Sequence, residues 1–181
     1  MVLTTGVLSA RAAQSADTTL EGIDVATTQA NLDFTAAAAG GVKFAVVKTG
    51  GSQLPTSPYV SPHYVKQVDS ARGAGMKVGH YWVIGDFRTL TAAADYFVDN
   101  LHGYQPGDVL AVDDELLDGS KILWDDAKIT TFLTEVRRRV PSAVLWFYIG
   151  ANNLRTHTPW TSTIATGAKL WVAVYGPNNG T

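Results

Sequence analysis

Residues 108–115 read Asp-Val-Leu-Ala-Val-Asp-Asp-Glu, an apolar run that ends in three consecutive carboxylates. A short apolar run of this kind is typical of a buried strand. Five further runs, each 6 to 8 residues long, are similarly rich in Val, Ile, Leu or aromatic residues. They are Leu20–Val25, Val42–Thr49, Lys77–Ile84, Ala143–Ile149 and Lys169–Tyr175. The sequence therefore predicts six strands, of which Asp108–Glu115 is the fourth.

Most of the segments between these runs are expected to be helices. The predicted helices are Leu32–Ala39, Pro62–Arg72, Ala92–Leu101 and Ala127–Val140. We expect Thr91 to cap the third and Asp125 or Asp126 to cap the fourth. The fourth has apolar residues at the helical period and three arginines, Arg137 to Arg139, near its end, where positive charge complements the helix dipole.

Alternation of strands and helices predicts a parallel sheet with helices outside it. An open doubly wound sheet and a closed β/α-barrel both fit this order. The sequence contains no GxGxxG motif and no phosphate-binding loop after a strand, which disfavours the nucleotide-binding folds.

Composition excludes several classes of protein. The chain has 181 residues, a net charge of −2 and no cysteine, so it offers no basic footprint for nucleic acid and no disulfide framework. No apolar stretch approaches the ~20 residues of a membrane span. Residues 1–20 are rich in Ala, Thr and Ser, and we expect a flexible arm or linker there, followed by one domain at 21–181.

Catalytic groups of parallel barrels lie at the carboxyl ends of the strands. The polar residues expected there are mainly carboxylates and tyrosines, a composition that suits a carbohydrate site. They are Asp24, Lys48, Tyr81, Asp113, Asp114, Glu115, Tyr148 and Tyr175.

The segment Val112–Glu115 carries the sharpest chemical signal. Because strand side chains alternate, Asp113 and Glu115 should share one face, while Asp114 should face the other way. Two neighbouring carboxylates repel each other when both are ionised, so one keeps its proton to higher pH, as an acid catalyst must. Glycoside hydrolysis uses such a pair. A loop of solvated acids is the alternative for this segment, and a turn or helix cap is the alternative for Asp24.

Other chemistries find less support. The four histidines, His63, His80, His102 and His157, lack the spacing of metal ligands, so we expect no metal and no cofactor. His80 lies within a predicted strand and is expected in the core. The tryptophans Trp82, Trp146 and Trp171 are also expected to be core residues rather than walls of a sugar cleft. No GxSxG motif marks a serine nucleophile.

Taken together, these segments resemble the family 25 glycoside hydrolases, the Chalaropsis-type muramidases that are common among phage lysins. The resemblance rests on residues 22–29 (GIDVATTQ), 44–49 (FAVVKT), 71–81 (ARGAGMKVGHY), 112–115 (VDDE), 147–149 (FYI) and 170–175 (LWVAVY), which follow the family's order. It implies a β/α (TIM-like) barrel. It also implies cleavage of the β-1,4 bond between N-acetylmuramic acid and N-acetylglucosamine in bacterial peptidoglycan.

The resemblance also implies roles for individual residues. Glu115 would be the general acid, and Asp113 would orient the substrate's acetamido group or stabilise the cationic centre. Asp24 would belong to the same acidic cluster. Substrate-binding positions would be Gln29, Tyr81, Tyr148 and Tyr175. The family is net retaining, and both a nucleophile and substrate assistance are compatible with these residues.

Three departures from the family pattern bear on the expectations. Ala26 and Ala30 stand where the family often has Ser and Gly, and Gly50-Gly51 stands where it has an acidic residue or Gln. The chain ends at Thr181, before the family's last strands and last aspartate, so we expect an irregular barrel that lacks its closing strands.

Two alternatives to a muramidase remain at this point. One is a non-catalytic wall-binding or structural domain of a phage tail or virion protein, which would have other virion proteins as partners. The other is an unrelated α/β enzyme such as a deacetylase, although its metal-ligating histidines are missing. The first alternative shares with the muramidase a place at the bacterial cell wall, outside the cell, reached as a phage lysin or virion component.

Overall fold

The structure is a computed structural model and describes residues 19–54, 57–86, 88–116, 123–157 and 159–174. Its strands are β1 (Gly22–Val25), β2 (Phe44–Gly51), β3 (Tyr59–Val60), β4 (Lys77–Val83), β5 (Val109–Asp114), β6 (Val144–Gly150) and β7 (Lys169–Ala173). Its helices are η1 (Thr27–Gln29), α1 (Phe34–Ala39), α2 (Tyr64–Gly73), α3 (Leu90–Asp99), α4 (Asp126–Arg139), α5 (Ala151–Thr156) and α6 (Thr161–Ala165). Nearly all of the arm predicted for residues 1–20 lies outside the described residues, as does Tyr175.

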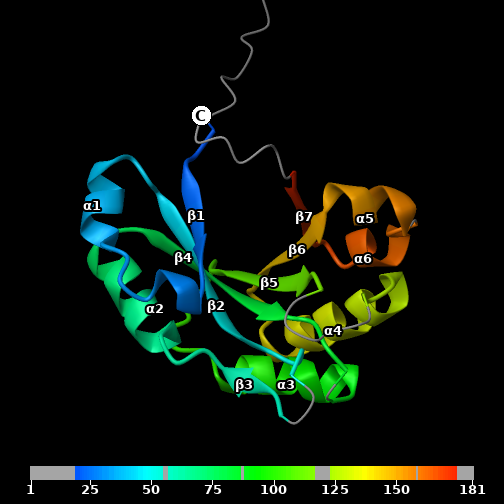
Figure 1. Cartoon of the computed structure of the whole chain (residues 1–181). Helices are drawn as coiled ribbons and strands as arrows, with labels where there is room; N and C mark the ends of the chain where they lie inside the picture. The colour runs from blue at the N-terminus through cyan, green and yellow to red at the C-terminus, as the bar shows by residue number, and fades with distance from the viewer. Residues whose placement is uncertain (1–18, 55–56, 87, 117–122, 158, 175–181) are drawn as a thin grey trace, which may run out of the picture.

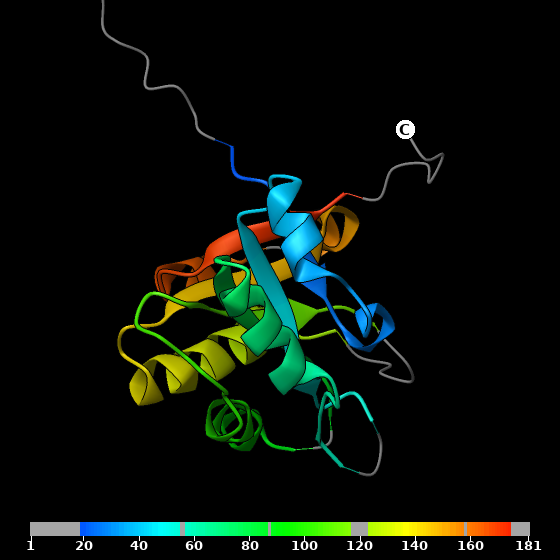
Figure 2. The same ribbon diagram turned by 90° about the vertical axis from the view of Figure 1, so that its left-hand side faces the viewer.

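The six predicted strands form one curled parallel sheet in the order β1-β2-β4-β5-β6-β7. The short β3 pairs antiparallel with the end of β2 and was not predicted. Figures 1 and 2 show helices packed around the outside of the sheet, with β1 and β7 as its two edges. These edges do not pair with each other within the described part of the chain. The prediction of a β/α-barrel that lacks closure is confirmed.

Two apolar clusters between the sheet and the helices make up most of the core. The larger joins β4, β5 and β6 to α3 and α4 and is centred on Trp82, Phe97 and Phe132. The other joins β1, β2 and β4 to α1 and α2 through Phe34, Tyr64 and neighbours. A third and smaller cluster covers part of the concave face of the sheet. Because the helices bury only the convex face, the rest of the concave face is left for polar groups.

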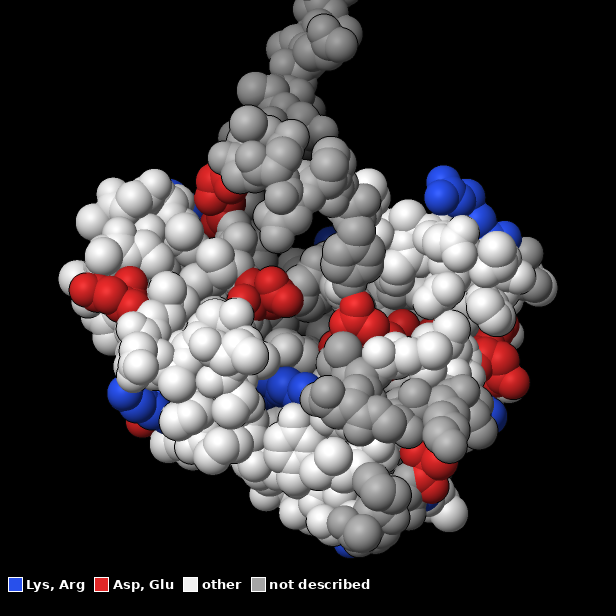
Figure 3. All heavy atoms as spheres, in the orientation of Figure 1, with Lys and Arg blue, Asp and Glu red and all other residues white. Residues whose placement is uncertain are grey.

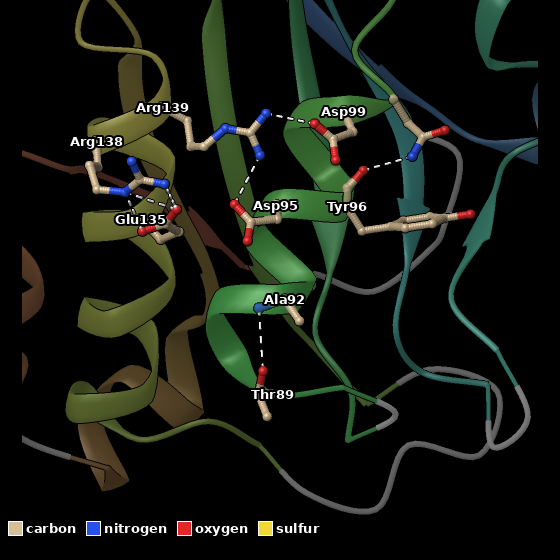
Figure 4. A network of polar contacts seen from close by, with 9 residues as sticks. Thr89, Ala92, Asp95, Tyr96, Asp99, Glu135, Arg138 and Arg139 are labelled. Atoms are coloured by element: carbon tan, nitrogen blue, oxygen red, sulfur yellow. Dashed lines mark hydrogen bonds and ion pairs between the residues drawn. The ribbon is translucent and has the colours of Figure 1, made fainter.

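Helices α3 and α4 are tied together at their ends. The Arg139 guanidinium donates to Asp95 at 2.9 Å and to Asp99 at 2.6 Å, both on α3 (Figure 4). Arg138 pairs instead with Glu135 on its own helix. These arginines lie in the last turn of α4, as the sequence predicted.

The structure confirms the predicted cap of α4 and contradicts the predicted cap of α3. Asp125 caps α4 by accepting from the Lys128 amide at 2.9 Å, which was one of the two predicted choices. The prediction for α3 was wrong: Thr89, not Thr91, accepts from the Ala92 amide, because the helix begins at Leu90. None of the helices in the described segments is both long and apolar enough to cross a membrane.

Candidate active site

Strand register places several of the predicted site residues on one face of the sheet. Lys48 is opposite Tyr81, and Asp113 is opposite both Val83 and Tyr148. Paired residues of a parallel sheet point to the same side, and so do residues two apart on one strand. Since Asp24 is opposite Val46, two residues before Lys48, it lies on this concave face as well.

The three acidic residues at the end of β5 point to alternate faces of the sheet, as predicted. Asp114 points to the convex side, where it is buried and accepts a hydrogen bond from the Trp124 amide at 2.9 Å. Burial raises the pKa of Asp114 to about 6, although the Trp124 hydrogen bond opposes the shift. Asp113 is buried on the concave side, and Glu115 follows directly after β5 and is half-buried. Asp114 is therefore a structural neighbour of the site rather than a part of it.

Asp113 is in an unfavourable place for a negative charge. Its side chain is 6% exposed, and one carboxylate oxygen has no hydrogen-bond partner among the described residues. Burial raises the pKa of Asp113 well above its ordinary value, and the negative charges of Glu115, Asp114 and Asp24 add to the rise, whereas Lys48 opposes it. The concave face thus gathers Asp24, Asp113 and Glu115 into one interacting acidic cluster.

Tyr81, on the same face, interacts with all three carboxylates of this cluster. Burial raises the pKa of its hydroxyl, and the charges of Asp113, Asp24 and Glu115 add to the effect. Tyr81 is therefore a neutral hydroxyl that can donate a hydrogen bond throughout the working range of a protein.

The other predicted substrate-binding residues have different surroundings. Tyr148 is half-buried on the concave face and packs edge-on against Trp171, with ring centroids 4.9 Å apart. Gln29 lies in η1, and its side chain accepts from the Ala26 amide and the Thr28 hydroxyl, both at 2.9 Å. The structure thus gives Gln29 a local role in the turn after β1. Tyr175 lies outside the described residues.

Two hollows border the concave face. One, of about 410 Å³, lies between the edge strands and is lined by Asp24, Phe44, Trp146 and Trp171 among others. A larger one, of about 590 Å³, lies at the amino end of the sheet beside Arg72 and Asp108 and contains none of the acidic cluster. Figure 3 shows acidic groups close to a basic group around a hollow on the face seen in Figure 1.

His80 is a core residue, as predicted. It is fully buried, its Nδ1 lies 2.8 Å from the Tyr64 hydroxyl and its Nε2 lies 3.5 Å from the Asp108 carboxylate. Burial lowers the pKa of His80. The described residues contain no group of three or more His, Cys, Asp or Glu side chains that could hold a metal.

Residues 23–181 match the sequence profile of Glycosyl hydrolases family 25. The chain belongs to this family. A search of curated proteins found no match. Among solved structures, the chain is similar to a muramidase from Acremonium alcalophilum, with 21% identity over 90% of this chain and 81% of that one, and a TM-score of 0.65. It is also similar to a bacterial lysozyme from Streptomyces coelicolor, with 21% identity, 90% and 77% coverage, and a TM-score of 0.66.

A third similar structure is that of the modular Cpl-1 endolysin complexed with a peptidoglycan analogue. It shares 19% identity over 88% of this chain and 45% of that one, with a TM-score of 0.61. At these identities the structural matches establish a shared fold. Family membership rests on the sequence profile, which begins within β1, includes the three carboxylates of the acidic cluster and extends past β7.

Two residues of this family 25 domain gain importance from the structure. Lys48 is buried on the concave face, and Trp171 lines the hollow between the edge strands. The prediction for Trp171 placed it in the core, but it is only half-buried. Lys48 was among the polar residues expected at strand ends, and it stands two residues after the inward-facing Val46.

Proposed function

We propose that the protein is an N-acetylmuramidase that cleaves the β-1,4 bond between N-acetylmuramic acid and N-acetylglucosamine in bacterial peptidoglycan. The observation that carries the proposal is the acidic cluster of Asp24, Asp113 and Glu115 around Tyr81, on the concave face of a family 25 chain. The muramidase and lysozyme among the similar structures support the same substrate.

The chemistry follows from the proximity of Asp113 and Glu115, since the negative charge of Glu115 disfavours ionisation of Asp113. The acid catalyst of a glycosidase must hold a proton that it can pass to the leaving oxygen. Glu115, half-buried after the end of β5, is the member that donates this proton to the leaving oxygen. Asp113 then acts on the developing positive charge, either directly or by orienting the substrate's acetamido group.

The remaining residues shape and polarise the cleft. Asp24 adds negative charge that favours a cationic transition state. Tyr81 donates a hydrogen bond, and Tyr148 offers an aromatic edge to a sugar ring. Gln29 and Tyr175 complete the predicted substrate-binding set. The reaction uses protein carboxylates alone and calls for no metal or cofactor.

The proposed substrate places the activity at the bacterial cell wall, outside the cell. Delivery as a phage lysin or virion component, with other virion proteins as partners, is part of the same proposal. The match to a modular endolysin supports it. We further propose that residues 1–20 form an arm or linker and that 21–181 form the hydrolase domain.

Digestion of purified peptidoglycan, with mass spectrometry of the soluble products, tests the proposal. Fragments with N-acetylmuramic acid at the reducing end are expected, whereas N-acetylglucosamine at that end would indicate the other glycosidic bond. A folded sample that binds peptidoglycan and releases nothing would instead support a non-catalytic wall-binding domain.

A further inference from the structure

Lys48 is a buried cation on β2. Its side chain is only 6% exposed, and burial of an ammonium group is costly unless other groups compensate its charge. Lys48 forms no ion pair with any described carboxylate. The compensation must therefore come from an aromatic ring and from charges at longer range.

The ring belongs to Tyr59. The Lys48 ammonium lies 5.6 Å from the centroid of this ring, a cation–π distance. Tyr59 is on β3, which pairs with the last residues of β2, and its hydroxyl accepts a hydrogen bond from Gln53 Nε2 at 3.2 Å. Gln53 thus holds the ring in place beside the lysine.

Gln53 packs closely against Gly51. A Cβ added at Gly51 would lie 1.9 Å from Gln53 Oε1, so a larger residue there would displace this carboxamide. The Gln53 side chain is 4% exposed, and its Oε1 has no hydrogen-bond partner among the described residues. The Tyr59 ring contacts the Lys48 ammonium, Gln53 is hydrogen-bonded to Tyr59, and Gly51 leaves room for Gln53. We call these three residues the lysine support.

Strand register places the Lys48 side chain on the same face of the sheet as the acidic cluster. Lys48 is opposite Tyr81 on β4, and Val83, two residues further along, is opposite Asp113 on β5. Neighbouring strands lie about 4.8 Å apart, so β2 and β5 are separated by roughly 10 Å across β4. The titratable groups that share this space are Asp24, Tyr59, Tyr81, Asp113 and Glu115.

We propose that Lys48 is a positioning residue that favours the ionised form of Asp113, by holding a positive charge on the same face as this buried carboxyl group. The proposal rests on the proposed function, which needs Glu115 protonated and Asp113 ionised. Burial and the like charges of the cluster favour the protonated form of Asp113, and the Lys48 charge opposes them. The lysine support keeps the cation from turning away to solvent.

The test is to titrate the Asp113 carboxyl by NMR in the wild-type chain, K48M and K48R, with D113N to assign the signal. K48M removes the charge and keeps the length of the side chain. We expect its Asp113 midpoint to rise by about one pH unit, a tenfold change in proton affinity. K48R, which keeps the charge, should retain most of the wild-type midpoint. The acidic limb of kcat/KM against pH should move upward in K48M alone.

An unchanged Asp113 midpoint in folded K48M would overturn the proposal, as would a pH-independent loss of activity with an unmoved limb. If K48M does not fold, Q53A decides, because it withdraws support from Tyr59 and leaves the charge in place. A higher Asp113 midpoint in Q53A supports the proposal, and an unchanged one contradicts it. The titration needs no turnover. A wild-type chain that releases no product would therefore refute the muramidase proposal separately.

Discussion

Asp108 and Asp113 stand at opposite ends of β5, and both are buried, at 7% and 6% exposure. Their partners differ. Asp108 forms an ion pair with Arg72, accepts from the Gln105 amide at 2.7 Å and lies 3.5 Å from His80 Nε2. Asp113 has one oxygen without a hydrogen-bond partner among the described residues, and negative charges surround it.

The two carboxylates show that burial alone does not decide the charge of a group. Burial raises the pKa of both, but at Asp108 the hydrogen bonds from His80 and Gln105 and the Arg72 charge bring the pKa below its ordinary value. At Asp113 the pKa stays raised. The amino end of the strand is therefore built for stability, and its carboxyl end keeps an unfavourable charge, as catalytic sites do.

The largest expected effect on activity comes from substitution of Glu115, the proposed proton donor. E115Q should lower kcat by about 10³-fold, because it removes the proton and keeps the shape of the side chain. The release of soluble peptidoglycan fragments by E115Q and wild type measures this. Circular dichroism should show the same folded state for both. Activity of E115Q close to wild type would assign the acid to another residue.

Next in size is the effect of D113N. We expect turnover to fall by about 10²-fold, because the amide cannot stabilise positive charge as a carboxylate does. The melting temperature should rise at pH 7, because the substitution removes a carboxyl group that burial and neighbouring negative charges destabilise in its ionised form. Parallel measurements of kcat and thermal unfolding check both parts.

D108N is the matched control, with the same substitution at the other end of β5. It should lower the free energy of unfolding by about 2 kcal/mol, because charge-assisted hydrogen bonds from Arg72 and Gln105 are weakened. Its folded fraction should keep wild-type turnover. If D108N and D113N changed stability in the same direction, the contrast between the two ends would be refuted.

The smallest effect concerns Asp114, which is buried like Asp113 but points away from the cluster. Its pKa is raised from 3.8 to about 6, so the folded state binds the proton more tightly than the unfolded state. Stability should therefore fall as pH rises from about 4 to about 6, and then level off. D114N should reduce this slope, leaving the share that comes from Asp113, and gain about 1–2 kcal/mol at pH 7. Urea denaturation of wild type and D114N across this range provides the measurement, and an unchanged slope in D114N would contradict the assignment.

The strands and the acidic pair could be predicted from the sequence because apolar runs and period-two alternation are local signals. Asp113 and Asp114 point to opposite faces as that alternation required. The pairing of β3 could not be predicted, because Tyr59–Val60 is two residues long and is fixed by the backbone of Gly50 and Gly51. The helices α5 and α6 were missed because each is short and lacks a helical apolar period.

The site was predicted in part for similar reasons. Asp24, Tyr81 and Asp113 follow from their positions at strand ends. Lys48 was also expected at a strand end, but its burial was not, because lysine is almost never buried and the three residues of the lysine support come later in the chain. Gln29, which a family motif suggested as a substrate-binding residue, also accepts two local hydrogen bonds in the turn after β1, which the sequence did not predict.

The edge position of β1 has a consequence for the domain's dynamics. This strand has four residues and, among the described elements, pairs only with β2, whereas β5 is held between two neighbours. Short edge elements open locally at a lower free energy than central strands. Each such opening would carry Asp24 away from the cluster while α3, α4 and the larger apolar core stay folded. The integrity of the acidic cluster and the global stability of the domain are thus separate quantities in this protein.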